Sequence, residues 1–80
     1  MGRPICYKGT ITDLNNGVSS GYYDVRGNVQ NGPVSSFYGI LLVIQGGSEI
    51  VQITSTNLNN LYLRTSTNSG TSWASWSALN

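Results

Sequence analysis

The sequence is poor in charged residues and contains no histidine. Only 9% of its 80 residues are charged, and the net charge is +1, whereas an ordinary globular domain carries about 25% charged residues. The four cations, at positions 3, 8, 26 and 64, are scattered along the chain. They do not form the basic patch that binding to nucleic acid requires, so we expect no nucleic-acid partner.

Cysteine is almost absent as well. The single Cys6 excludes an internal disulfide framework, and a zinc site needs several Cys or His residues. The lone thiol indicates synthesis in a reducing compartment, with a disulfide to another chain as the alternative. The three acids, Asp13, Asp24 and Glu49, are too dispersed for a calcium site within one chain. We expect no metal and no cofactor, although a site on an oligomer axis stays open.

These absences also argue against catalysis. A hydrolytic triad needs a base, usually His, to activate its nucleophile. Asp13 and Asp24 lie at apparent turns and strand edges, where carboxylates usually cap or stay solvated. Gly46-Gly47-Ser48 lacks the Lys and the strand–loop–helix context of a phosphate-binding loop. We expect no catalytic residues and no enzyme.

Long hydrophobic runs are missing too. The longest, Ile40–Ile44, has five residues, and about 20 are needed to span a bilayer. The segment Met1–Ile5 has no apolar core of a signal peptide. We therefore expect neither membrane insertion nor a signal peptide. At 80 residues the chain forms one domain at most.

Short β-branched and aromatic runs, bounded by Gly, Asn or Ser, recur about every ten residues, and no apolar pattern has a helical period. This spacing predicts an all-β fold, a small antiparallel meander or sandwich of five to six short strands. The expected strands are residues 9–12, 21–25, 39–45, 49–54, 61–65 and 71–77. The expected connections are a turn or single helical turn at 13–17, a loop at 26–36 and tight turns at 46–47, 59–60 and 68–70.

Alternation along the strands at 49–54 and 61–65 divides their side chains between two faces. The apolar set predicts the core: Val51, Ile53, Leu61 and Leu63. The polar set predicts a half-exposed face: Gln52, Tyr62 and Arg64. Together with Trp76, these three are the candidate contacts to a receptor or glycan, because sugar recognition uses an exposed ring beside amide and hydroxyl groups.

Each aromatic residue has two other interpretations, core packing and a subunit contact. Trp73 and Trp76 are three positions apart, so in a regular strand they point to opposite faces. One should be buried and the other should lie at a surface or an interface. Tyr22 and Tyr23 should divide in the same way.

The run at 40–44 is apolar on both sides, and a small domain offers only one interior. We expect one of its faces, either Ile40, Leu42 and Ile44 or Leu41 and Val43, at a subunit interface. Two alternatives remain open. The loop at 26–36, with Val29, Val34 and Phe37 nearby, could fold over this face, or the sheet could close into a small barrel.

Several short segments follow one another in a characteristic order: Asp13-Leu14-Asn15, then 21–25, 39–43, 50–53, 61–65 and 72–79. The most specific part is Tyr62-x-Arg64-Thr65 followed by Trp73-x-x-Trp76. In this order the segments resemble the pyocin-knob module of phage tail fibres and phage-tail-like bacteriocin fibres, and the similarity covers most of the chain, from Asp13 to Leu79. One departure is Asp24, where many members have another polar or small residue.

The resemblance implies a β-rich knob, usually trimeric within a fibre, that caps or presents the host-contacting end, without catalysis. It would divide the chain into a lead-in strand or connector at 1–12 and a knob domain at 13–80. The expected location is the virion, after synthesis in the bacterial cytoplasm, and the expected partners are two further copies and a host-surface glycan or receptor. The alternatives are an independent carbohydrate-binding module of a surface or secreted protein and a small phage assembly or head-decoration protein.

Overall fold

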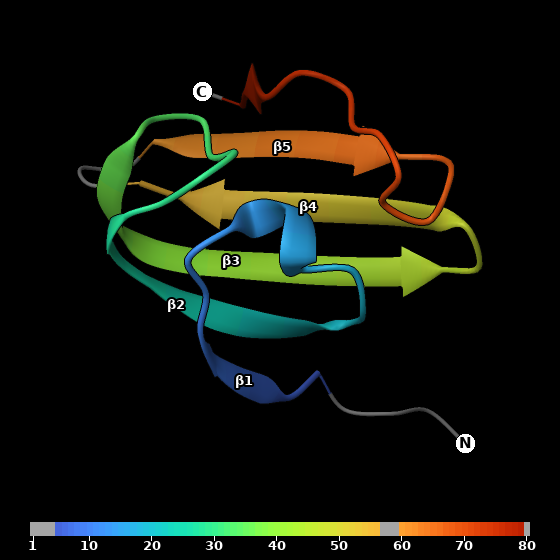
Figure 1. The fold of residues 1–80 in the computed structure, drawn as a ribbon, viewed down its shortest axis with the longest axis horizontal. Helices are drawn as coiled ribbons and strands as arrows, with labels where there is room; N and C mark the ends of the chain where they lie inside the picture. The colour runs from blue at the N-terminus through green and yellow to red at the C-terminus, as the bar shows by residue number, and fades with distance from the viewer. Residues whose placement is uncertain (1–4, 57–59, 80) are drawn as a thin grey trace.

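The structure, a computed structural model, describes residues 5–56 and 60–79. Within these residues six strands form one sheet with the order β1-β2-β3-β4-β5-β6 (Figure 1). β1 pairs with β2 in parallel, and all later neighbours are antiparallel. The predicted small all-β meander is confirmed. The strands are β1 (Tyr7–Thr10), β2 (Gly21–Asn28), β3 (Ser36–Gly46), β4 (Glu49–Ser55), β5 (Leu61–Ser66) and β6 (Ser77–Ala78).

The predicted turn at 13–17 is a single 3-10 turn, η1 (Leu14–Asn16). Asp13 caps it, because a carboxylate oxygen of Asp13 accepts a hydrogen bond from the Asn15 backbone N–H at 3.0 Å. No helix in the described part of the chain is long or apolar enough to cross a membrane.

Several boundaries differ from the sequence prediction, and the first strand, expected at residues 9–12, is β1 at Tyr7–Thr10. β2 and β3 extend into the segment expected to be a loop, so the connection between them shrinks to residues 29–35. The expected strand at 71–77 is wrong except for its last residue, because β6 is only Ser77–Ala78. The expected turn at 59–60 falls partly outside the described residues.

The expected lead-in strand is β1, which lies at the edge of the sheet beside β2 (Figure 1). Just after β1, the Ile11 side chain is buried in the core. Residues 7–11 are therefore an integral part of the same sheet and core as the chain that follows.

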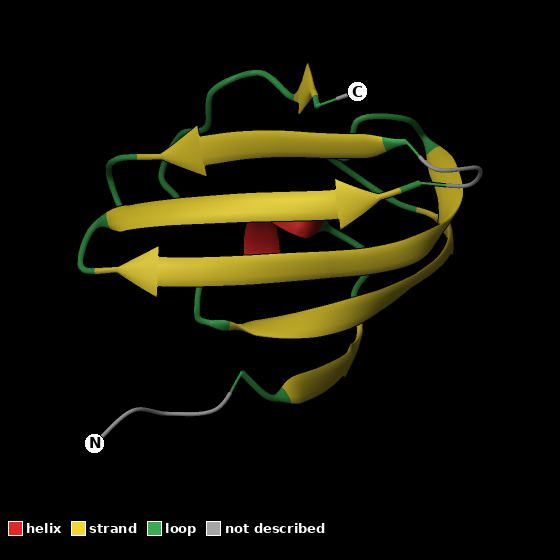
Figure 2. Cartoon of the chain, turned by 180° about the vertical axis from the view of Figure 1, so that it is seen from behind, coloured by secondary structure: helices red, strands yellow, loops and turns green. Residues whose placement is uncertain are grey.

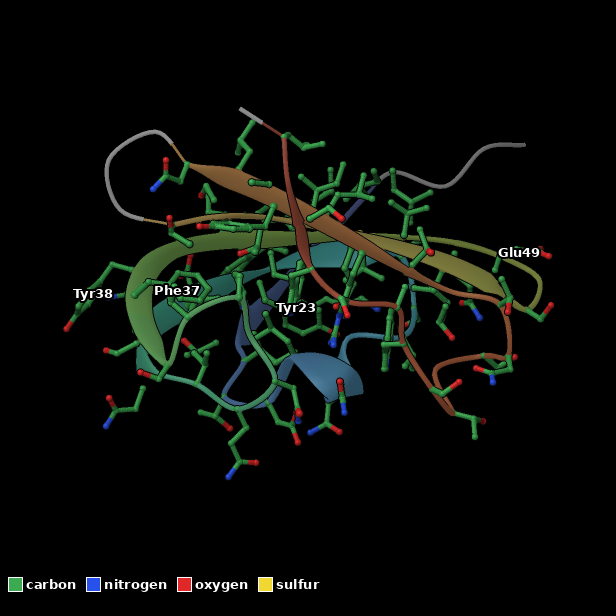
Figure 3. The ribbon with its side chains drawn as sticks, turned by 90° about the horizontal axis from the view of Figure 1, so that it is seen from above. Tyr23, Phe37, Tyr38 and Glu49 are labelled. Atoms are coloured by element: carbon green, nitrogen blue, oxygen red, sulfur yellow. The ribbon has the colours of Figure 1, made fainter. Side chains whose placement is uncertain are left out.

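The two faces of the sheet differ in what covers them. η1 and the connection 29–35 lie across one face (Figure 1), which we call the inner face. The other, which we call the open face, is turned to the viewer in Figure 2, and no described segment crosses it. Seen edge-on, Tyr23 and Phe37 point to the side of η1 (Figure 3). The buried apolar residues are Ile11, Leu14, Val25, Phe37, Leu41, Val43 and Ile50.

The face assignment made from β4 and β5 is wrong. Buried side chains of these strands are Ile50, Gln52, Thr54, Arg64 and Ser66. The expected core residues Val51, Ile53, Leu61 and Leu63 alternate onto the open face. The physical reason is that η1 covers the inner face. Its backbone carbonyls need hydrogen-bond donors from the sheet beneath them. Polar side chains therefore meet η1, and the apolar set is left on the other side.

The apolar side chains of residues 40–44 in β3 lie on both faces of the sheet. Leu41 and Val43 are 0% exposed on the inner face, whereas Ile40 and Ile44 are 48% and 46% exposed on the open face. The connection 29–35 reaches the inner face, where its Val29 packs against the core. The sheet order does not close into a barrel. The covering loop thus accounts for one face only, and the face of Ile40, Leu42 and Ile44 has no cover from the described residues.

Gly39 allows β3 to pass close to the end of β4. A Cβ at this position would overlap the Ser55 carbonyl oxygen. The Ile40 backbone N–H donates to the Ser55 Oγ at 3.2 Å, and the Thr54 hydroxyl donates to the Ile40 carbonyl at 3.1 Å. These bonds hold two backbones at a separation that leaves no room for a side chain.

We expect Gly39→Ala to lower the free energy of unfolding by about 2–3 kcal/mol, because the overlap is with backbone and cannot be relieved by a rotamer change. Urea denaturation followed by tryptophan fluorescence measures this. Gly46→Ala in the same strand is the control, since a Cβ there meets nothing within 4 Å. Equal stabilities of the two variants would contradict the close approach.

Candidate binding pocket around Arg64

Arg64 lies on the inner face of β5 and is only 6% exposed. Its guanidinium carbon is 4.2 Å from the ring centroid of Trp73 and 4.6 Å from that of Trp76. Both distances are within the range of cation–π attraction, which is stronger in a desolvated site. Both rings therefore contact the guanidinium.

The same guanidinium is joined by hydrogen bonds to η1. Arg64 donates from Nε to the Gln52 Oε1 and from Nη2 to the Asn15 Oδ1, both at 2.8 Å. Gln52 in turn donates from Nε2 to the carbonyls of Leu14 and Gly17, at 2.6 and 2.8 Å. This network fastens η1 to the middle of the sheet.

The prediction that Trp73 and Trp76 point to opposite faces is wrong. Residues 73–76 have no regular strand structure, so the alternation rule does not apply to them, and both rings reach the same guanidinium. The Trp76 indole N–H donates to the Asn31 carbonyl at 3.0 Å. Asn31 donates through its side chain to an Asp13 carboxylate oxygen at 2.8 Å. The segment thereby bridges β5, the connection 29–35 and the cap of η1.

These contacts enclose a hollow of about 380 Å³ that opens to the surface. Its wall is formed by a cation, two indole rings and polar side chains from three separate segments. The wall residues used below are Asn15, Asn31, Arg64, Ser72, Trp73, Ser75 and Trp76. We call this hollow the Arg64 pocket.

The charge of Arg64 is poorly compensated. Burial lowers the pKa of Arg64 to about 10, and the negative charge of Asp13 opposes that shift, so the side chain remains a cation at neutral pH. Asp13 accepts hydrogen bonds from Asn15 and Asn31. Across residues 5–56 and 60–79, the structure records an ion pair for Arg26 with Asp24, at 3.4 Å, but none for Arg64.

Of the predicted contact residues, the structure brings Arg64 and Trp76 together in this pocket. Gln52 lies beneath them and is 0% exposed, so it cannot touch a ligand and instead orients Arg64. Tyr62 is not among the residues that line the pocket. Sequence reasoning missed Asn15 and Asn31, because they come from segments far from Arg64 in the chain. It missed Ser72 and Trp73, because it expected a regular strand at 71–77, in which Trp73 and Trp76 point to opposite faces.

Metal-ligating groups are dispersed. Among the described residues, no three His, Cys, Asp or Glu side chains are grouped so that they could hold a metal ion. Asp24 instead accepts a hydrogen bond from the Tyr7 hydroxyl at 2.7 Å. The absence of a cofactor stays a prediction.

The open face is a second candidate site. Two rows of cross-strand neighbours run across it, and neighbours of this kind on one face contact each other directly. One row joins Tyr22, Leu42, Ile53 and Leu63, and the other joins Ile44, Val51 and Thr65.

Comparisons with protein-family models, with curated proteins and with solved structures find no match to this chain.

Proposed function

We propose that this chain is a non-enzymatic knob module of a phage or prophage tail fibre, which caps or presents the host-contacting end of a trimeric fibre. The observation that carries the proposal is the open face of the sheet. Three of its side chains, Ile40, Ile44 and Leu61, are 48%, 46% and 41% exposed, and Ile44 lies beside Val51 in one of the two rows.

A face of this kind is costly in a protein that works alone. Leaving a Leu or Ile side chain in water forgoes roughly 1.5–3 kcal/mol compared with burying it. Monomeric proteins rarely expose contiguous apolar patches larger than a few hundred Å². An 80-residue domain also gains little from its own small core, so association would recover stability that the fold needs.

Further copies of this chain fit the open face better than a charged partner does. The two rows across the face contain no charged residue. The charges of this face lie at its margins: Asp24, opposite Ile40, pairs with Arg26 at 3.4 Å, and Glu49 stands at the start of β4. Closed cyclic symmetry is the usual form of such self-association, and three copies around one axis suit a fibre. The virion location follows from this assignment.

A second candidate function is an independent carbohydrate-binding module. The Arg64 pocket favours it, because rings, amides and hydroxyls surround a hollow of about 380 Å³, a composition that suits polar ligands. The two functions differ in the oligomeric state that they require.

Light scattering of the purified chain should give a mass of about three times 8.6 kDa at micromolar concentration. A glycan screen on the same sample tests the second candidate. A monomer at high micromolar concentration that binds sugar would contradict the fibre proposal and favour the independent module. Replacing Ile44 by another apolar residue should not disturb the trimer, so Ile44→Val should give the same mass as the original chain.

A further inference from the structure

A buried cation for which the described residues record no ion pair needs an explanation, since Asp13 acts on Arg64 only through its charge. Removing an ionic group from water costs several kcal/mol unless a partner of opposite charge compensates it. Arg64 is 6% exposed, and its hydrogen bonds go to the uncharged side chains of Gln52 and Asn15. The two indole rings offer partial compensation through their π faces, but neither carries a negative charge.

The guanidinium also retains donors. Arginine has five N–H groups, and the hydrogen bonds that the described residues make with Arg64 leave from Nε and Nη2 alone. Nη1 has no recorded acceptor among them. Since Arg64 forms part of the wall of an open pocket, a ligand can supply the acceptor that the chain does not.

The rest of the wall is suited to a sugar. Asn15, Asn31 and Ser72 bring amide and hydroxyl groups from three segments to one hollow. The partly exposed indoles of Trp73 and Trp76 add apolar surface beside them. A planar guanidinium matches the geometry of a carboxylate. The amide and hydroxyl groups around it are the polar partners that the hydroxyl groups of a sugar need.

We propose that the Arg64 pocket binds the carboxylate of an acidic sugar, such as a uronic acid unit of a host-surface glycan. This rests on the proposed role of the chain at the host-contacting end of a fibre. It assigns to that role a ligand class and a site. Arg64 supplies the charge, Gln52 and Asn15 orient it, and the two indoles line the pocket beside it.

The test uses the full chain labelled with ¹⁵N and two matched ligands. The methyl glycosides of glucuronic acid and of glucose differ only in whether C6 is a carboxylate or a hydroxymethyl group. We expect the glucuronide to shift the Arg64 Nε–H and the two indole N–H resonances, and to bind about tenfold more tightly than the glucoside because of the charge interaction. Equal binding of both ligands, or binding of neither, would overturn the inference.

Ser75 offers a variant that leaves Arg64 in place. It is exposed, it lines the pocket and no hydrogen bond of its side chain is recorded within the described ranges. Ser75→Asp should bind the glucuronide about tenfold more weakly than the neutral Ser75→Asn, which has nearly the same shape, because of charge repulsion. Equal affinities of the two variants would place the ligand elsewhere and would overturn the inference.

Two further measurements show whether the pocket binds a sugar or any small anion, and whether the binding and fibre proposals hold separately. Acetate and inorganic phosphate at the same concentration should bind at least tenfold more weakly than the glucuronide, because they lack the sugar ring. Equal binding of acetate would mean a site for any small anion and would contradict a sugar site.

Light scattering on the same samples distinguishes the sugar-binding proposal from the fibre proposal. A trimer that does not bind the glucuronide overturns only this inference, and a monomer that binds it overturns only the fibre assignment.

Discussion

Val43→Asp should unfold the chain, whereas Ile44→Asp should leave it folded and convert a trimer into a monomer. The two positions are neighbours in β3 and point to opposite faces. Val43 is 0% exposed on the inner face, and Ile44 is 46% exposed on the open face. An unpaired carboxylate beneath η1 would cost several kcal/mol, and a domain of this size has only about 4–12 kcal/mol of stability.

At position 44 the same carboxylate would remain in water in the monomer, so the fold should survive. In the trimer it would bring three like charges into an apolar interface, which should raise the dissociation constant at least about 100-fold. Circular dichroism measures folding and light scattering measures mass. If both variants unfold, or if Ile44→Asp stays trimeric, the open face is not the interface.

Gln52→Leu should lower the free energy of unfolding by about 3–5 kcal/mol although it replaces a buried polar residue with an apolar one. The substitution leaves three buried groups without their present partners: the carbonyls of Leu14 and Gly17 and the Nε–H of Arg64. Each unsatisfied group costs about 1–3 kcal/mol. Urea denaturation monitored by tryptophan fluorescence gives this value.

The matched control is Gln45→Leu, the same substitution in the same sheet. Gln45 is exposed, and within residues 5–56 and 60–79 its side chain donates to the nearby Gly47 carbonyl alone, at 3.3 Å, so its replacement should change stability by about 0.5 kcal/mol or less. A Gln52→Leu protein as stable as this control would show that the network does not hold η1 on the sheet.

Much of the fold follows from local signals in the sequence. Gly, Asn or Ser stands at both ends of β2 and β3, and turn chemistry acts within a few residues. Asp13 and Asn15 place η1 through one hydrogen bond between neighbours, and the Gly46–Gly47 pair marks the β3–β4 turn. The parallel pairing of β1 with β2 was not predicted, because it depends on where η1 carries the chain between them.

The candidate site was only partly predictable. The resemblance and the residue types singled out Arg64 and Trp76, and both line the pocket. Asn15 and Asn31 could not be placed beside them from spacing, since they approach Arg64 only through the return of the chain over the sheet. The pairing of an arginine in a strand with two tryptophans shortly after it is the one sequence signal that could have located Trp73.

The sequence by itself determined that the chain is all-β, where most strands lie and that β3 carries more apolar surface than one interior can bury. Alternation separates the side chains of a strand into two sets, but it does not say which set is covered. Tertiary structure decided that, because the backbone of η1 and its loops brings carbonyl groups onto one face. Those groups need the donors of Gln52, so the polar set is buried and the apolar set is left open.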